Sequence, residues 1–358
     1  MTILWINLAI VFTLSYLARY YAVVPVGTYF PATVKASKVL VFGVMLCLII
    51  VSGLRSNIGD TYVYKSVYET TDFTWEYIQS QKDMGFGLLQ KLLKLISSDP
   101  QILLFTTAAI TNILIIIVFF KYSRMFELST YVYITGGTFL VSMNGMRQLL
   151  AASIAFIATK YLIERNPIKF FLVIALASTI HISALVLLPM YFFVKYKAWS
   201  KATLIVLAFA VLIVLGYGMF SEFLFSAIQD TQYGEYQNFN EGGASIIRVA
   251  VSAAPLCLAY LGKDKLREIF PESDYFVNMT LIGIAIMLVS TQNWIFARLA
   301  IYFELYQLVL IGWVVKLFEE KAQRFVYFSM IICYLIFYFY ESVITLNIYY
   351  NSNYITLP

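Results

Sequence analysis

Four arginines at the ends of apolar segments are the residues best suited to do chemistry in this chain: Arg55, Arg147, Arg248 and Arg298. The last three come where an apolar helix is expected to begin, and a helix N-terminus already presents free N–H groups and a partial positive charge. Adding a cation there is unfavourable unless an anion is bound nearby. Because arginine binds phosphate oxygens in a forked geometry, these residues predict a site for a pyrophosphate group.

His181 is the only histidine, and it stands between two short apolar segments. An imidazole can take a proton from a sugar hydroxyl near neutral pH, or it can simply hydrogen-bond a substrate oxygen. Both roles are open from the sequence. Asp60, or a loop carboxylate such as Glu235, could act as the base instead. Glu304 and Glu341 lie nearer the membrane interior, where we expect them to pair with an outer arginine or a tyrosine.

Helical spacing indicates where two of the arginines point. Arg147 shares a helix face with Ala151 and Ala155, and Arg248 shares one with Ser252. Small residues mark the faces along which membrane helices pack closely. Both arginines are therefore expected to point into the bundle.

The elements that position these residues are membrane helices. With 61% hydrophobic and 13% charged residues, the sequence contains long apolar stretches without the alternating polarity of a barrel strand. We predict an all-α, polytopic integral membrane protein that forms a single membrane domain, 1–358. About twelve transmembrane or part-spanning helices are expected, roughly at 2–19, 36–54, 101–120, 130–143, 146–163, 168–180, 182–195, 202–220, 246–261, 276–291, 297–316 and 325–346.

Basic residues predict the orientation of these helices. Lysines and arginines gather in alternate connections, near 19–38, 121–124, 160–169, 195–201, 263–267 and 316–324. Cytoplasmic loops carry the excess of positive charge, so these connections are predicted to be inside and both termini outside. The segments 130–143, 168–180 and 182–195 are too short to cross. We expect them to be broken helices beside a polar cavity.

Two longer connections lie on the predicted outer side. The outer loop 55–100 ends in a helical pattern, Gly87–Ile96, which is expected to lie in the membrane interface. The outer loop 221–247 is acidic and is predicted to be a lid over the mouth of the cavity. Tyrosines in these loops suit stacking on sugar rings as well as the interfacial belt, and we single out Tyr62, Tyr64 and Tyr236.

Several chemistries have no motif in the sequence. One histidine and three cysteines, Cys47, Cys257 and Cys333, support neither a metal site nor a disulfide framework. There is no Gly-rich phosphate loop and no Asp-x-Asp pair, so we expect no cofactor and a donor that is not a nucleotide. The net charge of +5 is dispersed through short loops and does not indicate a nucleic-acid partner.

Five motifs follow one another along most of the chain: Ser52-Gly-Leu-Arg55 with Gly59-Asp60 and Tyr64, Asp83-Met-Gly-Phe-Gly87, Asn144-Gly-Met-Arg147-Gln148 with Ala151, His181-Ile-Ser183-Ala184, and Arg298-Leu-Ala-Ile-Tyr302 preceded by Arg248. In this order they resemble the EpsG family of polysaccharide-biosynthesis membrane proteins, which is related to Wzy-type polymerases. One departure is Asp83, because the family usually has glutamate at that place.

The resemblance implies a polymerase at the outer face of the bacterial plasma (inner) membrane. Such an enzyme joins oligosaccharide repeat units carried on polyprenyl pyrophosphate, with membrane lipid, a flippase and a chain-length-regulating co-polymerase as further partners. The donor pyrophosphate would be bound by Arg55, Arg147, Arg248 and Arg298, and the catalytic residues would be His181, Arg147 and Asp60. The residues expected to bind sugar are Tyr62, Tyr64, Asn144, Gln148, Glu235, Tyr236 and Tyr302.

Two other functions remain open. A flippase or exporter of the lipid-linked glycan would need charges along a path through the membrane, and the segment centres carry few. A membrane acyltransferase that modifies the glycan could also use one histidine and several arginines. The species that accumulates in a mutant separates the three: lipid-linked repeats outside indicate a polymerase, the same repeats inside a flippase, and unacylated polymer an acyltransferase.

Overall fold

The computed structural model describes residues 1–22, 34–228 and 242–355, and every regular element in them is a helix. The first half contains α1 Thr2–Tyr20, α2 Lys38–Gly53, α3 Thr61–Thr70, α4 Trp75–Ser80, α5 Met84–Lys94, α6 Gln101–Tyr122, α7 Phe126–Thr135, α8 Thr138–Asn144, α9 Met146–Ile157 and α10 Thr159–Ile163. The second half contains α11 Pro167–Ile180, the 3-10 helix η1 Ile182–Leu187, α12 Met190–Phe193, α13 Lys201–Leu215, α14 Tyr217–Ile228, α15 Ile246–Leu261, α16 Lys263–Ile269, α17 Ser273–Val289, α18 Ile295–Val314, the 3-10 turn η3 Val315–Leu317, α19 Glu320–Tyr338 and the π-helix η4 Phe339–Thr345. The all-α prediction is confirmed for the described part of the chain.

Five helical stretches are long and apolar enough to cross a membrane: α1, α6, α9 with α10, α18 with η3, and α19 with η4. A sixth is reached if α15 and α16, which are bent by 83° at their junction, count as one span. Five other apolar stretches, α2, α11, η1 with α12, α13 and α17, are shorter. A 15-residue helix is only about 22 Å long, against a hydrocarbon core of about 30 Å. Length and composition thus indicate a helical membrane protein with five or six candidate spans, and the larger number of about twelve stays a prediction.

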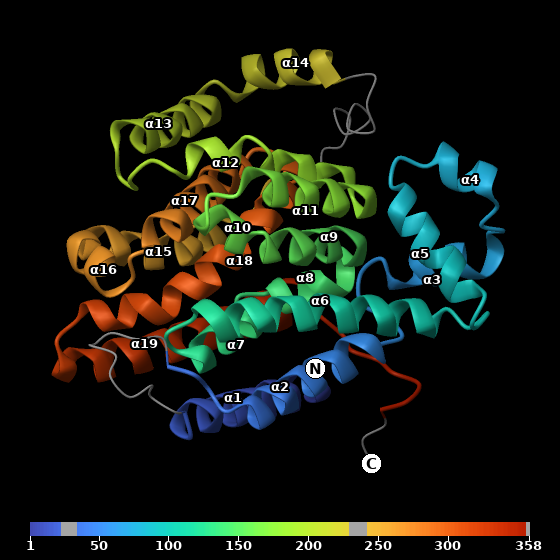
Figure 1. The fold of residues 1–358 in the computed structure, drawn as a ribbon, viewed down its shortest axis with the longest axis horizontal. Coiled ribbons are helices and arrows are strands. Elements are labelled where there is room, and N and C mark those ends of the chain that lie inside the picture. The colour runs from blue at the N-terminus through green and yellow to red at the C-terminus, as the bar shows by residue number, and fades with distance from the viewer. Residues whose placement is uncertain (23–33, 229–241, 356–358) are drawn as a thin grey trace.

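The helices lie roughly along one direction, so their connections gather at two opposite ends (Figure 1). In that view α16 and the turn from α18 to α19 lie at the left-hand end, whereas α3 to α5 and the last described residues lie at the right-hand end. The basic connections at 263–267 and 316–324 are therefore far from the loop 55–100. This separation agrees with an alternating topology, and which end faces the outside of the cell stays a prediction.

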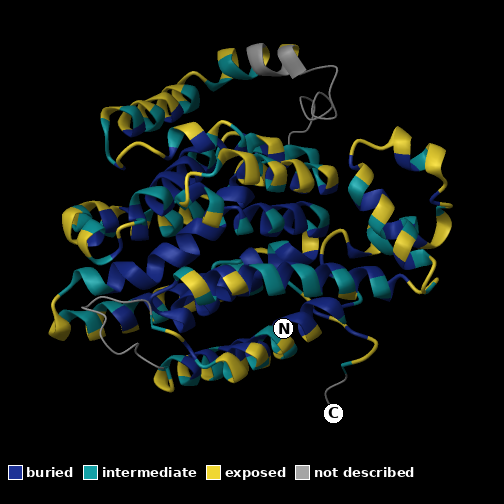
Figure 2. Cartoon of the chain, in the orientation of Figure 1, coloured by how far each residue is buried: buried dark blue, intermediate teal, exposed yellow. Residues whose placement is uncertain are grey.

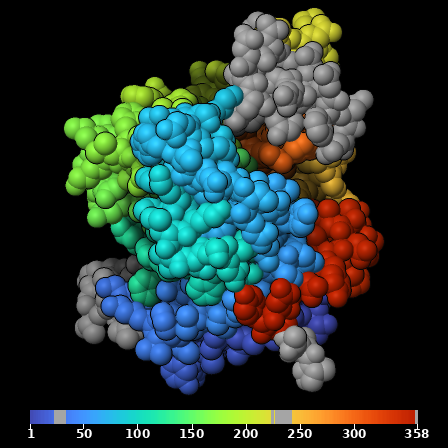
Figure 3. Space-filling view, turned by 90° about the vertical axis from the view of Figure 1, so that its right-hand side faces the viewer, coloured from blue at the N-terminus to red at the C-terminus, as the bar shows by residue number. Residues whose placement is uncertain are grey.

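The loop 55–100 folds into three short helices, α3, α4 and α5, which lie in the centre of Figure 3, the view onto the right-hand side of Figure 1. Leu88, Leu92 and Leu95 of α5 are exposed, as an interfacial helix requires. Lys94, in contrast, turns toward α3 and its Nζ donates to the carbonyl of Tyr68 at 2.9 Å. A cation is favoured at that C-terminal end of α3, so Lys94 fastens α5 to α3.

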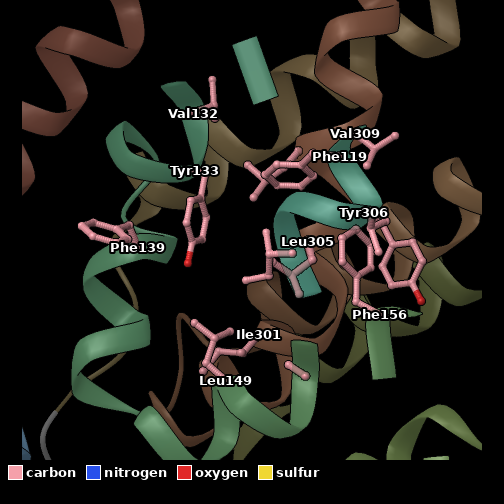
Figure 4. Close-up of a cluster of buried hydrophobic side chains, with 14 of the residues drawn as sticks. Phe119, Val132, Tyr133, Phe139, Leu149, Phe156, Ile301, Leu305, Tyr306 and Val309 are labelled. Carbon is pink, nitrogen blue, oxygen red and sulfur yellow. The ribbon is translucent and has the colours of Figure 1, made fainter. Parts of the chain in front are cut away.

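The core of the bundle is built around α18, which Figure 2 shows as buried along most of its length. A cluster of aromatic and aliphatic side chains packs α18 against α6 to α9 (Figure 4). Within it, Phe156 of α9 meets Tyr306 of α18 edge-to-face, with ring centroids 5.1 Å apart. Close packing of this kind, rather than the hydrophobic effect, holds helices together in lipid. It fixes the start of α9 relative to the start of α18, and so places Arg147 relative to Arg298.

Breaks in three helices confirm the prediction of short or interrupted segments. The stretch 130–143 is divided between α7 and α8 at Gly136 and Gly137. α8 gives way to α9 at Gly145, and α11 ends at His181, whose backbone is extended (φ −153°, ψ 118°) before the 3-10 helix η1. Backbone groups freed at such breaks must be satisfied by protein or by water in a cavity.

Candidate functional site

A cavity of about 510 Å³ opens at the end of the bundle that carries α3 to α5. Its walls come from the start of α3, the α8–α9 and α11–η1 junctions, residues 243–245, α18 and η4. The charged and polar side chains that line it include Asp60, Tyr64, Asn144, Arg147, Gln148, His181, Ser245, Arg248, Arg298, Glu304 and Glu341. The structure thus brings most of the predicted site residues into one polar cavity beside the broken helices.

Asp83 connects Arg147 and His181. Its Oδ2 lies 3.1 Å from Nη1 of Arg147 and 3.3 Å from Nδ1 of His181, and its Oδ1 accepts the backbone N–H of Ile182 at 2.9 Å. Burial alone would raise the pKa of this carboxyl group, but the close contact with Nδ1 of His181 and the charge of Arg147 lower that pKa overall. Asp83 is therefore ionised at neutral pH.

Close packing between α5 and α11 brings Asp83 to His181. A Cβ atom on Gly85 would lie 2.3 Å from Oγ1 of Thr179 and 2.9 Å from the Thr179 carbonyl oxygen. Only a residue without a side chain allows this approach. The sequence Asp83-Met-Gly85 therefore combines the carboxylate with the glycine that lets the segment 55–100 approach α11 closely enough for Asp83 to contact His181.

Arg147 begins α9 and lines the cavity, as its sequence position predicts. Ala151 and Ala155, on the same helix face, are buried, which confirms that this face packs inside the bundle. The guanidinium carbon also lies 5.8 Å from the centre of the Phe86 ring. Phe86 and Asp83 both belong to the segment 55–100, so this segment holds Arg147 from two directions.

Arg248 is paired with a carboxylate inside the cavity. Its Nε donates to Oε1 of Glu341 at 2.8 Å, and its Nη2 contacts the same oxygen. The expectation that Glu341 pairs with an arginine is confirmed, and the outer location of this pair stays a prediction. Glu304 lines the cavity as well, so this wall is less positive than the sequence suggested.

Arg298 stacks on an aromatic ring, and its guanidinium carbon lies 4.6 Å from the centre of the Trp294 ring. Among the described residues, ion pairs bind Arg147 and Arg248 to carboxylates, but no carboxylate lies within 4 Å of the Arg298 guanidinium. Gln148 holds the backbone at this point, because its Nε2 donates to the carbonyl of Arg298 at 2.7 Å. Arg298 is therefore the cavity arginine whose charge is least neutralised.

Asp60 is held at the mouth of the cavity by Asn144. Its backbone N–H donates to Oδ1 of Asn144 at 3.0 Å. The preceding Gly59 has φ +52°, and a Cβ there would lie 1.9 Å from the same Oδ1. This turn therefore requires glycine. The amide of Asn144 positions the loop, and the carboxylate of Asp60 is exposed toward the cavity.

Arg55 does not line the cavity. It is 1% exposed, and its guanidinium donates to Oγ1 of Thr61 at 3.0 Å, to the carbonyl of Met143 at 2.8 Å and to that of Ser52. Burial lowers its pKa to about 10, which leaves it charged at neutral pH. The two carbonyls lie in the last turns of α2 and α8, where a cation is favoured. Its position fits a structural role and separates it from the three other arginines.

Other predicted residues also lie elsewhere. Tyr302 is 1% exposed, and its hydroxyl lies 2.8 Å from Oγ of Ser183, so it ties α18 to η1 instead of facing the cavity. Tyr62 is 79% exposed and is not among the cavity residues. Glu235 and Tyr236 lie outside the described residues, as does the part 229–241 of the loop 221–247 that was predicted to be a lid.

Sequence reasoning missed two members of the site, Asp83 as the link between Arg147 and His181, and Trp294 beneath Arg298. The available signal for Asp83 was an acidic residue two positions before a glycine in the outer loop. Within the described ranges no three His, Cys, Asp or Glu side chains gather closely enough to hold a metal ion.

The fold and the site define a helical membrane protein with a polar, arginine-lined cavity at one end of its bundle. The chain matches the EpsG family over residues 38–356, nearly its whole length. It belongs to the EpsG family, which fits a membrane protein of exopolysaccharide biosynthesis. No curated protein and no solved structure matches the chain.

Proposed function

We propose that this protein is a polysaccharide polymerase that joins oligosaccharide repeat units carried on polyprenyl pyrophosphate, at the outer face of the plasma membrane. Membership of the EpsG family supports a role in polysaccharide biosynthesis. The observation that carries the proposal is the cavity that Arg147, Arg248 and Arg298 share with His181.

The arginines suit the leaving group of this reaction. When the bond between the anomeric carbon and the pyrophosphate oxygen breaks, negative charge develops on that oxygen. Cations already in place stabilise the charge without having to reorganise. Arg147 and Arg298 also stand near the N-termini of α9 and α18, where the helix dipole adds to the positive potential.

The acceptor is a sugar hydroxyl of a second repeat unit. Its oxygen attacks the anomeric carbon of the donor, and the glycosidic bond forms as the electron pair of the old bond leaves with the lipid pyrophosphate. The hydroxyl proton passes to Nε2 of His181 and from there to water. Asp60 is the alternative base at the mouth of the cavity, and Tyr64 and Gln148 offer hydrogen bonds to the sugars.

Reconstitution tests this function. The purified protein in lipid nanodiscs is given a polyprenyl-pyrophosphate-linked oligosaccharide, and we expect a ladder of longer glycans together with free polyprenyl pyrophosphate. Arg324→Ala, at an exposed residue of α19 at the opposite end of the bundle, is a control that should leave the ladder unchanged. A wild-type protein that releases no polyprenyl pyrophosphate from an inserted substrate refutes the proposal. In cells, lipid-linked repeats that accumulate inside a deletion strain would point to a flippase instead.

A further inference from the structure

The geometry points to Asp83 as a positioning residue that fixes the tautomer of His181 and the place of Arg147, so that the outer segment α3 to α5 completes the site. The kinetic part of this inference rests on the proposed function. The structural part concerns the protonated nitrogen of one imidazole and stands without it.

The two carboxylate oxygens of Asp83 contact different groups. Oδ1 accepts the backbone N–H of Ile182 at 2.9 Å, which sets the plane of the carboxylate. Oδ2 is left for Nδ1 of His181 at 3.3 Å and for Nη1 of Arg147 at 3.1 Å. The side chain is only 5% exposed, so water contributes little to holding these groups.

This arrangement decides which nitrogen of His181 can act as a base. An ionised carboxylate only accepts hydrogen bonds, so the nitrogen beside it must carry the proton. Nδ1 is then N–H, and Nε2 keeps its lone pair. The imidazole, whose side chain is 13% exposed, lines the cavity. With its lone pair free, Nε2 can act as the base that removes a proton from a hydroxyl.

The charged groups around Asp83 come from two other elements. Arg147 belongs to α9, and His181 ends α11. Burial raises the pKa of Tyr64 of α3, and the charges of Arg147 and Arg298 oppose that rise. One carboxylate thus serves both the cation and the base, which would otherwise repel each other once His181 takes up a proton.

Asp83→Asn reverses the tautomer according to this geometry. The amide oxygen of Asn must face the N–H of Ile182, because that donor is otherwise left unsatisfied in a buried position. The NH2 group then takes the place of Oδ2 and donates to Nδ1 of His181. The proton of the imidazole moves to Nε2, and the NH2 group also repels Arg147.

Nitrogen NMR measures this directly, because His181 is the only histidine in the sequence. Protein labelled with 15N-histidine, purified without a histidine tag and held in nanodiscs at alkaline pH, gives the signals of one imidazole. In the wild type we expect a protonated Nδ1 and an unprotonated Nε2. In Asp83→Asn we expect a protonated Nε2 and an unprotonated Nδ1. Asp72→Asn, an exposed aspartate of the same outer segment, is the matched control. A wild-type spectrum with the proton on Nε2 overturns the inference, whatever the variant does.

Kinetics provide the second measurement. Asp83→Asn should lower kcat by roughly 10²–10⁴-fold with little change in KM, and it should lower kcat far less in a His181→Ala background, because both changes remove the same base. Equal effects in the two backgrounds would mean that Asp83 acts through the fold alone and would overturn the inference. If the wild type makes no polymer at all, the proposed function fails while the tautomer result still decides the role of Asp83.

Discussion

Replacement of Arg298 tests the anion site most directly. Its guanidinium stacks on Trp294 at 4.6 Å and has no carboxylate partner within 4 Å among the described residues. Its removal therefore leaves no buried acid unpaired. Arg147→Ala would remove the arginine partner of Asp83, and Arg248→Ala would remove that of Glu341. A buried charge without its partner destabilises the fold in itself.

The expected magnitude follows from what each substitution removes. Arg298→Ala deletes one preorganised charge that stabilises the leaving pyrophosphate, and the loss of one such group costs about 2.7–4 kcal/mol, or roughly 10²–10³-fold in kcat. Arg298→Lys keeps the charge and loses one of the two forked hydrogen bonds. A hydrogen bond to a charged group contributes about 1.5–3 kcal/mol, so the loss in kcat should be roughly 10–150-fold.

The assay is the rate of polyprenyl pyrophosphate release in nanodiscs, at several donor concentrations so that kcat and KM are separated. Arg324→Ala and Arg324→Lys are the matched controls, because Arg324 is exposed at the opposite end of the bundle. Thermal unfolding of each variant checks that the fold is intact. A folded Arg298→Ala protein with kcat within threefold of wild type would show that the anion is bound elsewhere.

Three further predictions follow from the site and the topology. If His181 is the base, His181→Gln should be as poor as His181→Ala, both roughly 10²–10⁴-fold down in kcat; recovery with Gln would make it a hydrogen-bonding group and move the base to Asp60. Because the pKa of Asp83 is lowered in the folded protein, its ionised form stabilises the fold above the unfolded-state pKa of about 3.9, and this contribution is lost as the pH falls through the lower folded-state value. The gap in melting temperature between wild type and Asp83→Asn should therefore narrow below about pH 4, and a gap that widens there contradicts the ion pairs. An impermeant thiol reagent should label intact cells at Asp72→Cys and not at Lys265→Cys, in a background without the native cysteines; the opposite pattern would invert the topology.

The sequence predicted those site residues whose position depends on where a helix begins or ends. A cation at the first turn of an apolar helix has few places to point, and Arg147, Arg248 and Arg298 all line the cavity. The position of His181 followed from the interruption between two short segments. Local pattern was enough for each of these residues.

The part that the sequence could not predict depends on long-range approach. Asp83 and Ile182 are separated by 99 positions in the sequence, and the residues next to each of them give no indication that the two are in contact. The structural role of Arg55 could not be predicted from its local sequence either. It stands at the C-terminal end of α2, where backbone carbonyls compete for its donors, and only the structure reveals that those of Ser52 and Met143 take them. The number of about twelve spanning or part-spanning helices stays a prediction, because an apolar run gives the composition of a helix more reliably than its length.

The segment after η4 lies along the loop that precedes Asp60. Asn351 accepts the N–H of Ser56 at 2.8 Å through its carbonyl and donates to Oδ1 of Asn57 at 2.7 Å. The hydroxyl of Tyr350 donates to the carbonyl of Val51 at 2.8 Å. A ribosome makes α1 to α19 before it reaches these residues, so these three hydrogen bonds to the segment 51–57 form only after the rest of the bundle has been made. The cavity that Asp60 and Tyr64 line is therefore supported in part by residues that are translated after η4.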